Sequence, residues 1–253
     1  KKNHAIHIHH RLTNKGLTVL VDKKKYNLFY PLQVWQRFPQ NYKQEFANLA
    51  TYSLTVHLSF ERFRTNRELF YHFPPPALES LFFKGIFYSL PEDTSVAGVT
   101  TTDYLKLLFN SYQRVHFQHH LPSQFITENI LSKNENRALI PFTFGKDSLL
   151  TFALTHELGI KPIVVFFCEP KADFENQHKL RLAKKFAKEF SQKIIFRPIS
   201  LGILRKMSED DPWWGWDPLL TQYTLLLIPY YFFYRPKYLF WSHEQSCNFA
   251  VPD

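Results

Sequence analysis

Cysteine, glycine and long apolar runs are all scarce in this chain of 253 residues. Its two cysteines, Cys168 and Cys247, exclude a disulfide-stapled scaffold and form no C-x-x-C pair for structural zinc or thioredoxin-like redox chemistry. Seven glycines against 26 phenylalanines predict a dense core with few glycine-dependent turns. The most apolar run, residues 225–234, is about half of the roughly 20 residues that a membrane span requires, and Pro229 interrupts it.

The rest of the composition is that of a globular protein with excess positive charge. Apolar residues make up 45% and charged residues 21%. The formal net charge of +9 favours anionic partners such as nucleotides, nucleic acid or a membrane surface. The polar start has no signal-peptide pattern, so we expect a cytoplasmic protein. Residues 249–253 follow a predicted strand without closing the fold, so we expect the chain to be part of a longer one.

The first 125 residues predict a smaller α+β region, whose role the sequence does not reveal. Alternating or apolar runs predict strands at 17–21, 26–30, 54–60, 69–73 and 82–88, and helical periodicity predicts helices at 41–52 and 102–116. Four histidines at positions 4, 7, 9 and 10 are a possible metal cluster, but at an unanchored terminus we interpret them as an incidental tail.

From about residue 126 onward, short apolar runs alternate with helices, which predicts an α/β domain over residues 126–253. The predicted strands are 138–142, 163–167, 193–199 and 238–241, and the predicted helices are 148–158, 171–190 and 219–234. Such alternation is typical of a parallel sheet with helices on its faces. Gly159 stands where the first of these helices should end.

The segment from Thr143 to Ser148 reads T-F-G-K-D-S and lies where the first of these strands turns into the first helix. Ligands of open α/β sheets bind outside the carboxyl ends of the strands, at the topological switch point. A helix that begins there offers N–H groups and a positive dipole end, both suited to phosphate. Gly145 allows close backbone approach, Lys146 adds charge, and the two terminal hydroxyls add donors.

This segment has two other interpretations. A Walker A loop is excluded, because Ile140 and Asp147 stand where that pattern needs Gly and Ser or Thr. An ordinary strand-to-helix turn, with Asp147 or Ser148 as the N-cap, stays open as the structural alternative.

The hexapeptide resembles the PP-loop of the ATP pyrophosphatases, the adenine nucleotide α-hydrolase-like superfamily, whose pattern is S-G-G-x-D-S. Thr143 keeps the first hydroxyl, whereas Phe144 replaces the first Gly. The resemblance implies a doubly wound parallel sheet of the HUP-like kind, and cleavage of ATP to AMP and pyrophosphate. It implies ATP-binding roles for Thr143, Phe144, Gly145, Lys146, Asp147 and Ser148, with Lys146 and Asp147 also catalytic and the adenine beside Phe167 and Glu169.

Two further blocks, residues 215–222 and 242–249, resemble the ATP-dependent epimerases of UDP-N-acetylmuramoyl-L-alanyl-L-glutamate in that superfamily. The matches are Gly215, Pro218, Glu244, Ser246 and Asn248, and the departures are Trp216, Asp217 and His243. This branch implies an isomerase acting on a peptidoglycan precursor. Its substrate carboxylate becomes an acyl-adenylate, and a base then removes the acidified Cα proton and returns it on the other face.

The resemblance also implies roles for residues in these blocks. Glu244 is a candidate metal ligand or base, and His243 is a candidate proton shuttle. Asp147 and Glu244 would hold Mg²⁺, which offsets the triphosphate charge. The candidate substrate-binding residues are Trp216, Asp217, Ser246 and Asn248. The alternative for each is a loop residue that caps a helix or makes a surface hydrogen bond, as with Asp217 before Pro218.

Two rival functions remain open. The first is a tRNA-modifying or sulfur-transferring PP-loop enzyme, which the basic segment 171–206, with ten Lys or Arg against three Asp or Glu, would suit. A sulfur carrier at Cys168 would belong to this rival, although the isolated cysteines count against it. The second is a nucleotide-binding module without turnover, in which Phe144 has altered the loop. The sequence identifies neither the acceptor nor the oligomeric state.

Overall fold

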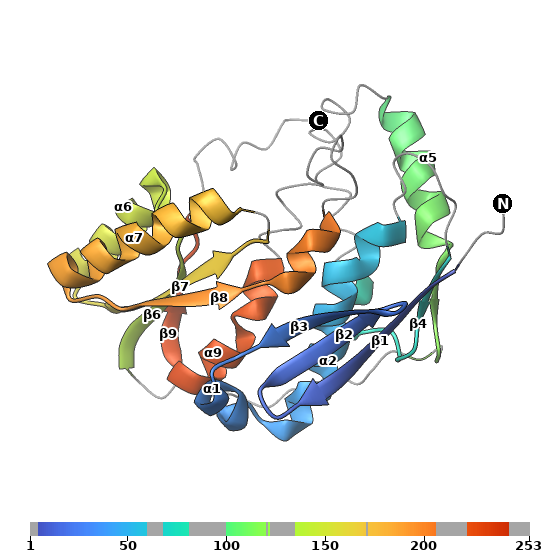
Figure 1. Cartoon of the computed structure of the whole chain (residues 1–253), viewed down its shortest axis with the longest axis horizontal. Helices are drawn as coiled ribbons and strands as arrows, with labels where there is room; N and C mark the ends of the chain where they lie inside the picture. Colours follow the sequence, from blue (N-terminus) through green and yellow to red (C-terminus); the bar gives the residue numbers. More distant parts are fainter. Residues whose placement is uncertain are drawn as a thin grey trace. The chain divides into compact units, whose positions relative to one another are not determined.

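The computed structural model describes residues 5–59, 68–80, 100–119, 121, 135–170, 172–205 and 222–242. Contacts divide the chain into two compact units, drawn in Figure 1. Unit 1 comprises Lys1–Glu128 and Ser200–Phe232, and unit 2 comprises Asn129–Ile199 and Phe233–Asp253. Residues 200–232, which the sequence analysis assigns to the C-terminal region, therefore group with the N-terminal part of the chain.

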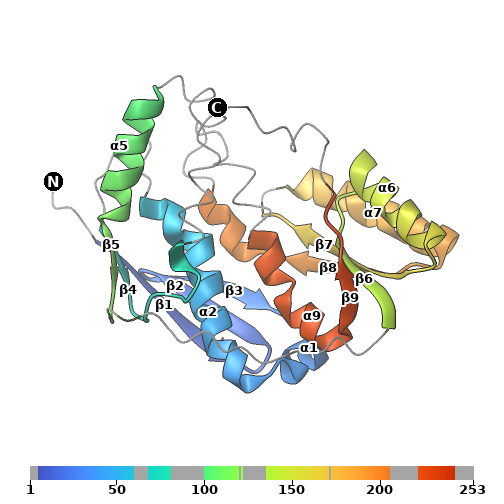
Figure 2. The same cartoon turned by 180° about the vertical axis from the view of Figure 1, so that it is seen from behind.

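Unit 1 is built on a five-stranded mixed sheet in the order β3-β2-β1-β4-β5. Its strands are β1 (Ile6–Thr13), β2 (Gly16–Val21), β3 (Lys24–Phe29), β4 (Leu69–Tyr71) and β5 (Val115–Phe117). The first three pair antiparallel, and β1, β4 and β5 pair parallel. Alternate residues such as Ile8 and Val19 are buried, and helix α2 (Gln40–Thr55) lies along the sheet (Figure 2). The strands predicted at 17–21, 26–30 and 69–73 are confirmed.

The other described elements of unit 1 are mostly helical. They are α1 (Leu32–Arg37), the 3-10 helices η1 (Val56–Ser59) and η2 (Ser200–Arg205), α5 (Thr101–Tyr112) and the start of α9 (Ile228–Tyr234). The helix predicted at 41–52 is confirmed as part of α2. The helix predicted at 102–116 ends earlier, because Val115 already belongs to β5. The strand predicted at 82–88 lies outside the described residues.

The strand predicted at 54–60 is wrong, because α2 and η1 occupy residues 54–59. Apolar and polar residues alternate there, yet the polar ones are buried instead of lining a solvated face. Their hydroxyls bond to the preceding turn: Thr55 Oγ1 donates to the Thr51 carbonyl at 2.6 Å, and Ser59 Oγ donates to the Val56 carbonyl at 2.8 Å. Satisfied hydroxyls can thus be buried in a helix and give a false strand pattern.

The histidine-rich start of the chain is a strand, so its interpretation as an incidental tail is wrong. Ile6 and Ile8 are buried, and His7 and His9, which alternate with them, are exposed, as in a half-buried strand. His9 stacks on His72 of the same sheet at a centroid distance of 3.8 Å. Among the described residues, no three His, Cys, Asp or Glu side chains are arranged to hold a metal ion.

His10 of the same strand should make unit 1 less stable in acid. Burial, and secondarily the nearby His9, lower the pKa of His10 from 6.5 to about 4. The unfolded chain therefore binds a proton that the folded chain rejects, so stability is full above pH 6.5 and is lost as pH falls toward 4. The loss is on the order of 3 kcal/mol. Urea unfolding at several pH values measures this loss. The free energy of unfolding should fall less between pH 6.5 and pH 4 for His10→Gln than for wild type.

A matched control for this measurement is His178→Gln, since His178 is exposed on a helix of unit 2. Its pH dependence should follow the wild type. Equal slopes for wild type and His10→Gln would contradict the burial of a neutral imidazole at position 10.

Unit 2 contains a four-stranded parallel sheet in the order β8-β7-β6-β9. Its strands are β6 (Glu135–Pro141), β7 (Lys161–Cys168), β8 (Ile194–Pro198) and β9 (Pro236–Leu239), and its helices are α6 (Lys146–Glu157) and α7 (Asp173–Phe190). The parallel sheet and these strands and helices confirm the prediction for this stretch. Both helices cover the same face (Figure 1), where Phe152 of α6 meets Phe186 of α7 at 4.7 Å between centroids.

The strand order reverses at β6. The chain steps from β6 to β7 and β8 on one side, and β9 then pairs on the other side of β6, with Leu239 opposite Leu139. The helix predicted at 219–234 is broken at Leu227 within its described part, because Pro229 has no N–H for the helical ladder. No helix in the described ranges has both the length and the hydropathy to cross a bilayer.

Candidate functional site

The loop of residues 143–148 connects the carboxyl end of β6 to α6, beside the reversal of strand order. Thr143, Gly145 and Lys146 are exposed, whereas Ser148 is buried. Gly145 is the N-cap of α6, so the alternative in which Asp147 or Ser148 caps the helix is wrong. Because glycine has no side chain to cap the helix, the first-turn N–H groups depend on other partners.

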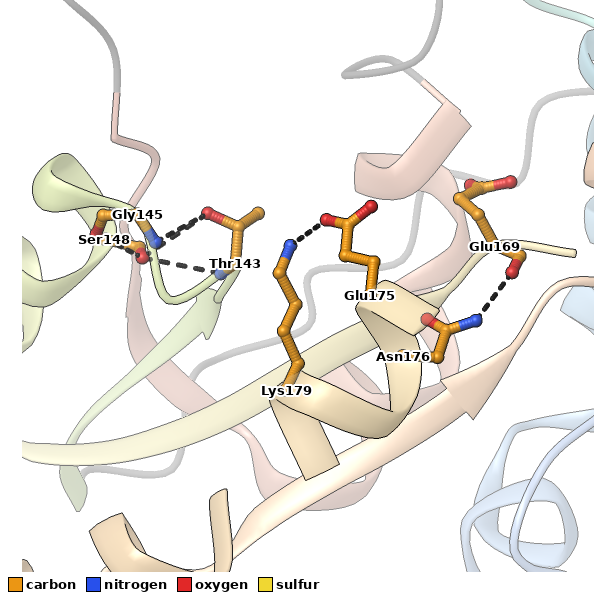
Figure 3. Close-up of polar contacts among 7 residues, drawn as sticks. All are labelled: Thr143, Gly145, Ser148, Glu169, Glu175, Asn176 and Lys179. Carbon is orange, nitrogen blue, oxygen red and sulfur yellow. Dashed lines mark hydrogen bonds and ion pairs between the residues drawn. The ribbon is translucent and has the colours of Figure 1, made fainter. Parts of the chain in front are cut away.

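Two hydroxyls shape this loop from within, as Figure 3 shows. Ser148 Oγ donates to the Gly145 carbonyl at 3.0 Å and accepts from the Thr143 N–H at 3.4 Å. Thr143 Oγ1 accepts from the Gly145 N–H at 3.3 Å. The two longer bonds are beyond the usual N–H···O range and therefore weak. The Thr143 hydroxyl can accordingly exchange its loop contact for a ligand, while Ser148 mainly supports the backbone.

Phe144 holds the loop in an unusual backbone conformation. Its φ of 62° is in the left-handed region, which costs a bulky side chain about 1–2 kcal/mol. The ring packs inward against Phe142 at 4.8 Å and Phe186 at 6.0 Å between centroids. Burial of a phenylalanine ring, worth about 2 kcal/mol, offsets the strain. Consequently the backbone of Phe144, and not its ring, is the part available to a ligand.

The two residues predicted beside a bound adenine lie at the carboxyl end of β7: Phe167 within the strand and Glu169 directly after it. Phe167 is buried in the sheet, whereas Glu169 is half-buried just beyond the strand. The Glu169 carbonyl accepts a hydrogen bond from Asn176 Nδ2 at 2.8 Å, which ties the end of β7 to the first turn of α7 (Figure 3). The prediction for Glu169 thus falls at the same sheet edge as the 143–148 loop.

Sequence reasoning missed two cations at this edge. Lys179 of α7 forms an ion pair with Glu175, and its Nζ lies 5.3 Å from the centroid of the Phe166 ring. Arg197 of β8 is only 6% exposed and pairs in register with Phe167 of β7. The available signal was the Glu175–Lys179 spacing of four residues at the start of the helix after β7. The charge of the basic segment 171–206 as a whole does not single out these individual positions.

Cys168, the last residue of β7, lies in an environment that raises the pKa of its thiol. Burial raises its pKa, and the charge of Glu169 raises it further, against lowering by a backbone hydrogen bond from Arg197 and by Lys179. A nucleophilic thiol needs a lowered pKa. The environment of Cys168 therefore gives no support to the sulfur-transfer rival.

The chain that follows β9 also reaches α6. Ser242 Oγ and Thr151 Oγ1 form a hydrogen bond at 2.8 Å, so the start of the block 242–249 lies beside the helix that carries the loop. The remaining predicted site residues lie outside the described residues and stay predictions: Trp216, Asp217, His243, Glu244, Ser246 and Asn248.

Comparisons with protein-family models, with curated proteins and with solved structures give no match to this chain. The functional argument therefore depends on the residues and geometry of unit 2.

Proposed function

We propose that unit 2 binds ATP at the 143–148 loop and cleaves it to AMP and pyrophosphate, in the manner of the PP-loop ATP pyrophosphatases. The observation that carries this proposal is an exposed loop before α6, with Phe144 in the left-handed region, at the reversal of strand order in a parallel sheet. In such sheets ligands bind at this point, and helix N-termini favour phosphate. A doubly wound, HUP-like fold for this part of the chain belongs to the same proposal.

The departure at Phe144 supports this assignment instead of weakening it. The S-G-G-x-D-S pattern has glycine at this position, and glycine adopts positive φ without strain. Phe144 adopts a φ of 62° at that place, so this chain keeps a glycine-like backbone with a different residue. A loop with turnover is therefore favoured over a nucleotide-binding module that Phe144 has altered.

In the proposed reaction, a carboxylate oxygen of the substrate attacks the α-phosphorus of ATP. The bond from this phosphorus to the bridging oxygen breaks, and pyrophosphate leaves with the electron pair. The products are an acyl-adenylate and pyrophosphate, and hydrolysis later releases AMP. Lys146, exposed in the first turn of α6, binds the leaving pyrophosphate and stabilises its growing charge.

Magnesium is the metal that this reaction implies, and when bound it offsets the charge of the triphosphate. Among the described residues, Asp147 in the first turn of α6 is the carboxylate suited to hold it. Mg²⁺ commonly binds one or two protein carboxylates together with substrate phosphates, so a single carboxylate fits this role. Glu244 is the proposed second ligand.

For the substrate we propose the glutamyl end of a muramyl peptide, epimerised through its acyl-adenylate. This finer proposal comes from the likeness of residues 215–222 and 242–249 to the epimerase branch. The hydrogen bond between the hydroxyls of Ser242 and Thr151 supports it, because the second block starts beside α6. In this scheme Glu244 and His243 exchange the Cα proton, and Trp216, Asp217, Ser246 and Asn248 hold the substrate.

A pyrophosphate assay with ATP and Mg²⁺ tests the function across candidate acceptors. We expect release of pyrophosphate and AMP in equal amounts with the glutamyl peptide, and deuterium uptake at Cα in D₂O. Release only with tRNA would favour the tRNA-modifying rival. ATP binding without release would favour the non-catalytic module, and production of ADP would contradict cleavage at the α-phosphate.

A further inference from the structure

Lys179 of α7 is unusually buried for a lysine. Its side chain is 19% exposed, whereas that of its partner Glu175 is 59% exposed. Lysines are rarely buried unless they are paired. The ion pair with Glu175 and the face of the Phe166 ring, 5.3 Å from Nζ, provide this pairing. The ammonium thus has both partners at a position where its side chain is largely shielded from solvent.

The position of this ammonium relates it to the candidate site. Phe166 contacts both Lys179 and Phe144, whose ring centroid is 6.3 Å from its own. The electrostatic effect of Lys179 on the pKa of Cys168 also places it near the end of β7. In Figure 3, Lys179 stands between Thr143 of the loop and Glu169 beyond β7.

We propose that Lys179 binds the α-phosphate of the nucleotide and that Glu175 competes with the nucleotide for this ammonium. The inference depends on the proposed function, in which the loop holds the outer phosphates and Glu169 lies beside the adenine. The α-phosphate joins these two parts, and Lys179 stands between the residues assigned to them. Its charge would then lie at the phosphorus that the carboxylate attacks, where negative charge grows in the transition state.

Glu175 suits the role of a displaceable partner. It lies in the first turn of α7, where a negative charge interacts favourably with the helix dipole, and its exposed side chain can turn into solvent. An i,i+4 ion pair on a helix contributes only a few tenths of a kcal/mol to stability. The α-phosphate of ATP carries a negative charge that its two non-bridging oxygens share. Because the Lys179 ammonium is poorly solvated, this phosphate should displace the Glu175 carboxylate from it.

Binding of ATP, AMP and adenosine, measured by calorimetry without acceptor, tests the inference. Lys179→Met keeps the apolar stem over Phe166 but removes the charge. Its affinities for ATP and AMP should each fall about tenfold, and its affinity for adenosine should stay unchanged. Lys179→Arg should bind ATP within about threefold of wild type, because it keeps the charge. Glu175→Gln should tighten ATP binding about threefold by removing the competing carboxylate.

The matched control is Lys185→Met, an exposed lysine of the same helix, which should bind all three ligands as wild type does. Circular dichroism should show native folding for every variant. Unchanged ATP and AMP affinities in Lys179→Met, or a loss for ATP alone, would overturn the assignment to the α-phosphate while leaving the proposed function intact. Failure of wild type to bind ATP would remove the proposed function and this inference together.

Discussion

Replacement of Lys146 by alanine should reduce pyrophosphate release from ATP by at least ~100-fold, the loss typical of removing one transition-state donor. Lys146 is exposed in the first turn of α6, where its charge adds to the positive end of the helix dipole. The thermal midpoint should shift by less than about 2 °C, since surface substitutions usually change stability by within ±0.5 kcal/mol. Release is followed with a coupled pyrophosphate assay at saturating ATP and Mg²⁺.

A good control for this variant is Lys161→Ala, which removes an exposed lysine at the amino end of β7. That edge of the sheet lies opposite the loop, so turnover should stay at the wild-type level. Asp147→Ala should lose turnover as Lys146→Ala does, through the proposed metal ligand. Full activity in both loop variants, or unfolding of both, would show that residues 143–148 are structural.

Replacement of Gly16 by alanine should give the largest loss of stability, about 3 kcal/mol or more. Gly16 has φ of 150° and pairs with Thr13 of β1 and Phe29 of β3, so strands flank it on both sides. An added Cβ would lie 2.1 Å from the Leu28 carbonyl oxygen. That atom is backbone and cannot turn away, so the strands must separate locally. The thermal midpoint of unit 1 should fall by about 6–12 °C.

Gly159→Ala separates steric clash from backbone strain. Gly159 also has positive φ, 64°, but nothing lies within 4 Å of its added Cβ. The Gly159→Ala variant should therefore lose only about 1 kcal/mol of its free energy of unfolding, which is the cost of the left-handed backbone. A loss for Gly16→Ala no larger than for Gly159→Ala would contradict the close packing of β2 on β3.

The candidate site was predictable only where its residues are contiguous. Thr143 to Ser148 form one local motif at a strand-to-helix junction, so their position at the carboxyl end of β6 followed from the chain order. Lys179 and Arg197 come from α7 and β8, and only parallel pairing with β7 brings them to the same edge. The inward direction of the Phe144 ring also needed the packed core, because its neighbours Phe142 and Phe186 belong to different elements.

Local pattern by itself determined most of unit 2, because each apolar run and each amphipathic helix from β6 to β8 is complete within a short window. The strand order was decided only by tertiary structure, because by sequence β9 could pair with β8 or with β6. Its pairing with β6 places the reversal of strand order beside the 143–148 loop. Residues 200–232 likewise join unit 1 through distant partners, as in the 2.7 Å bond from Gln222 Nε2 to the Ser53 carbonyl. Periodicity depends on neighbours in sequence, whereas strand pairing and docking depend on contacts between residues far apart in the chain.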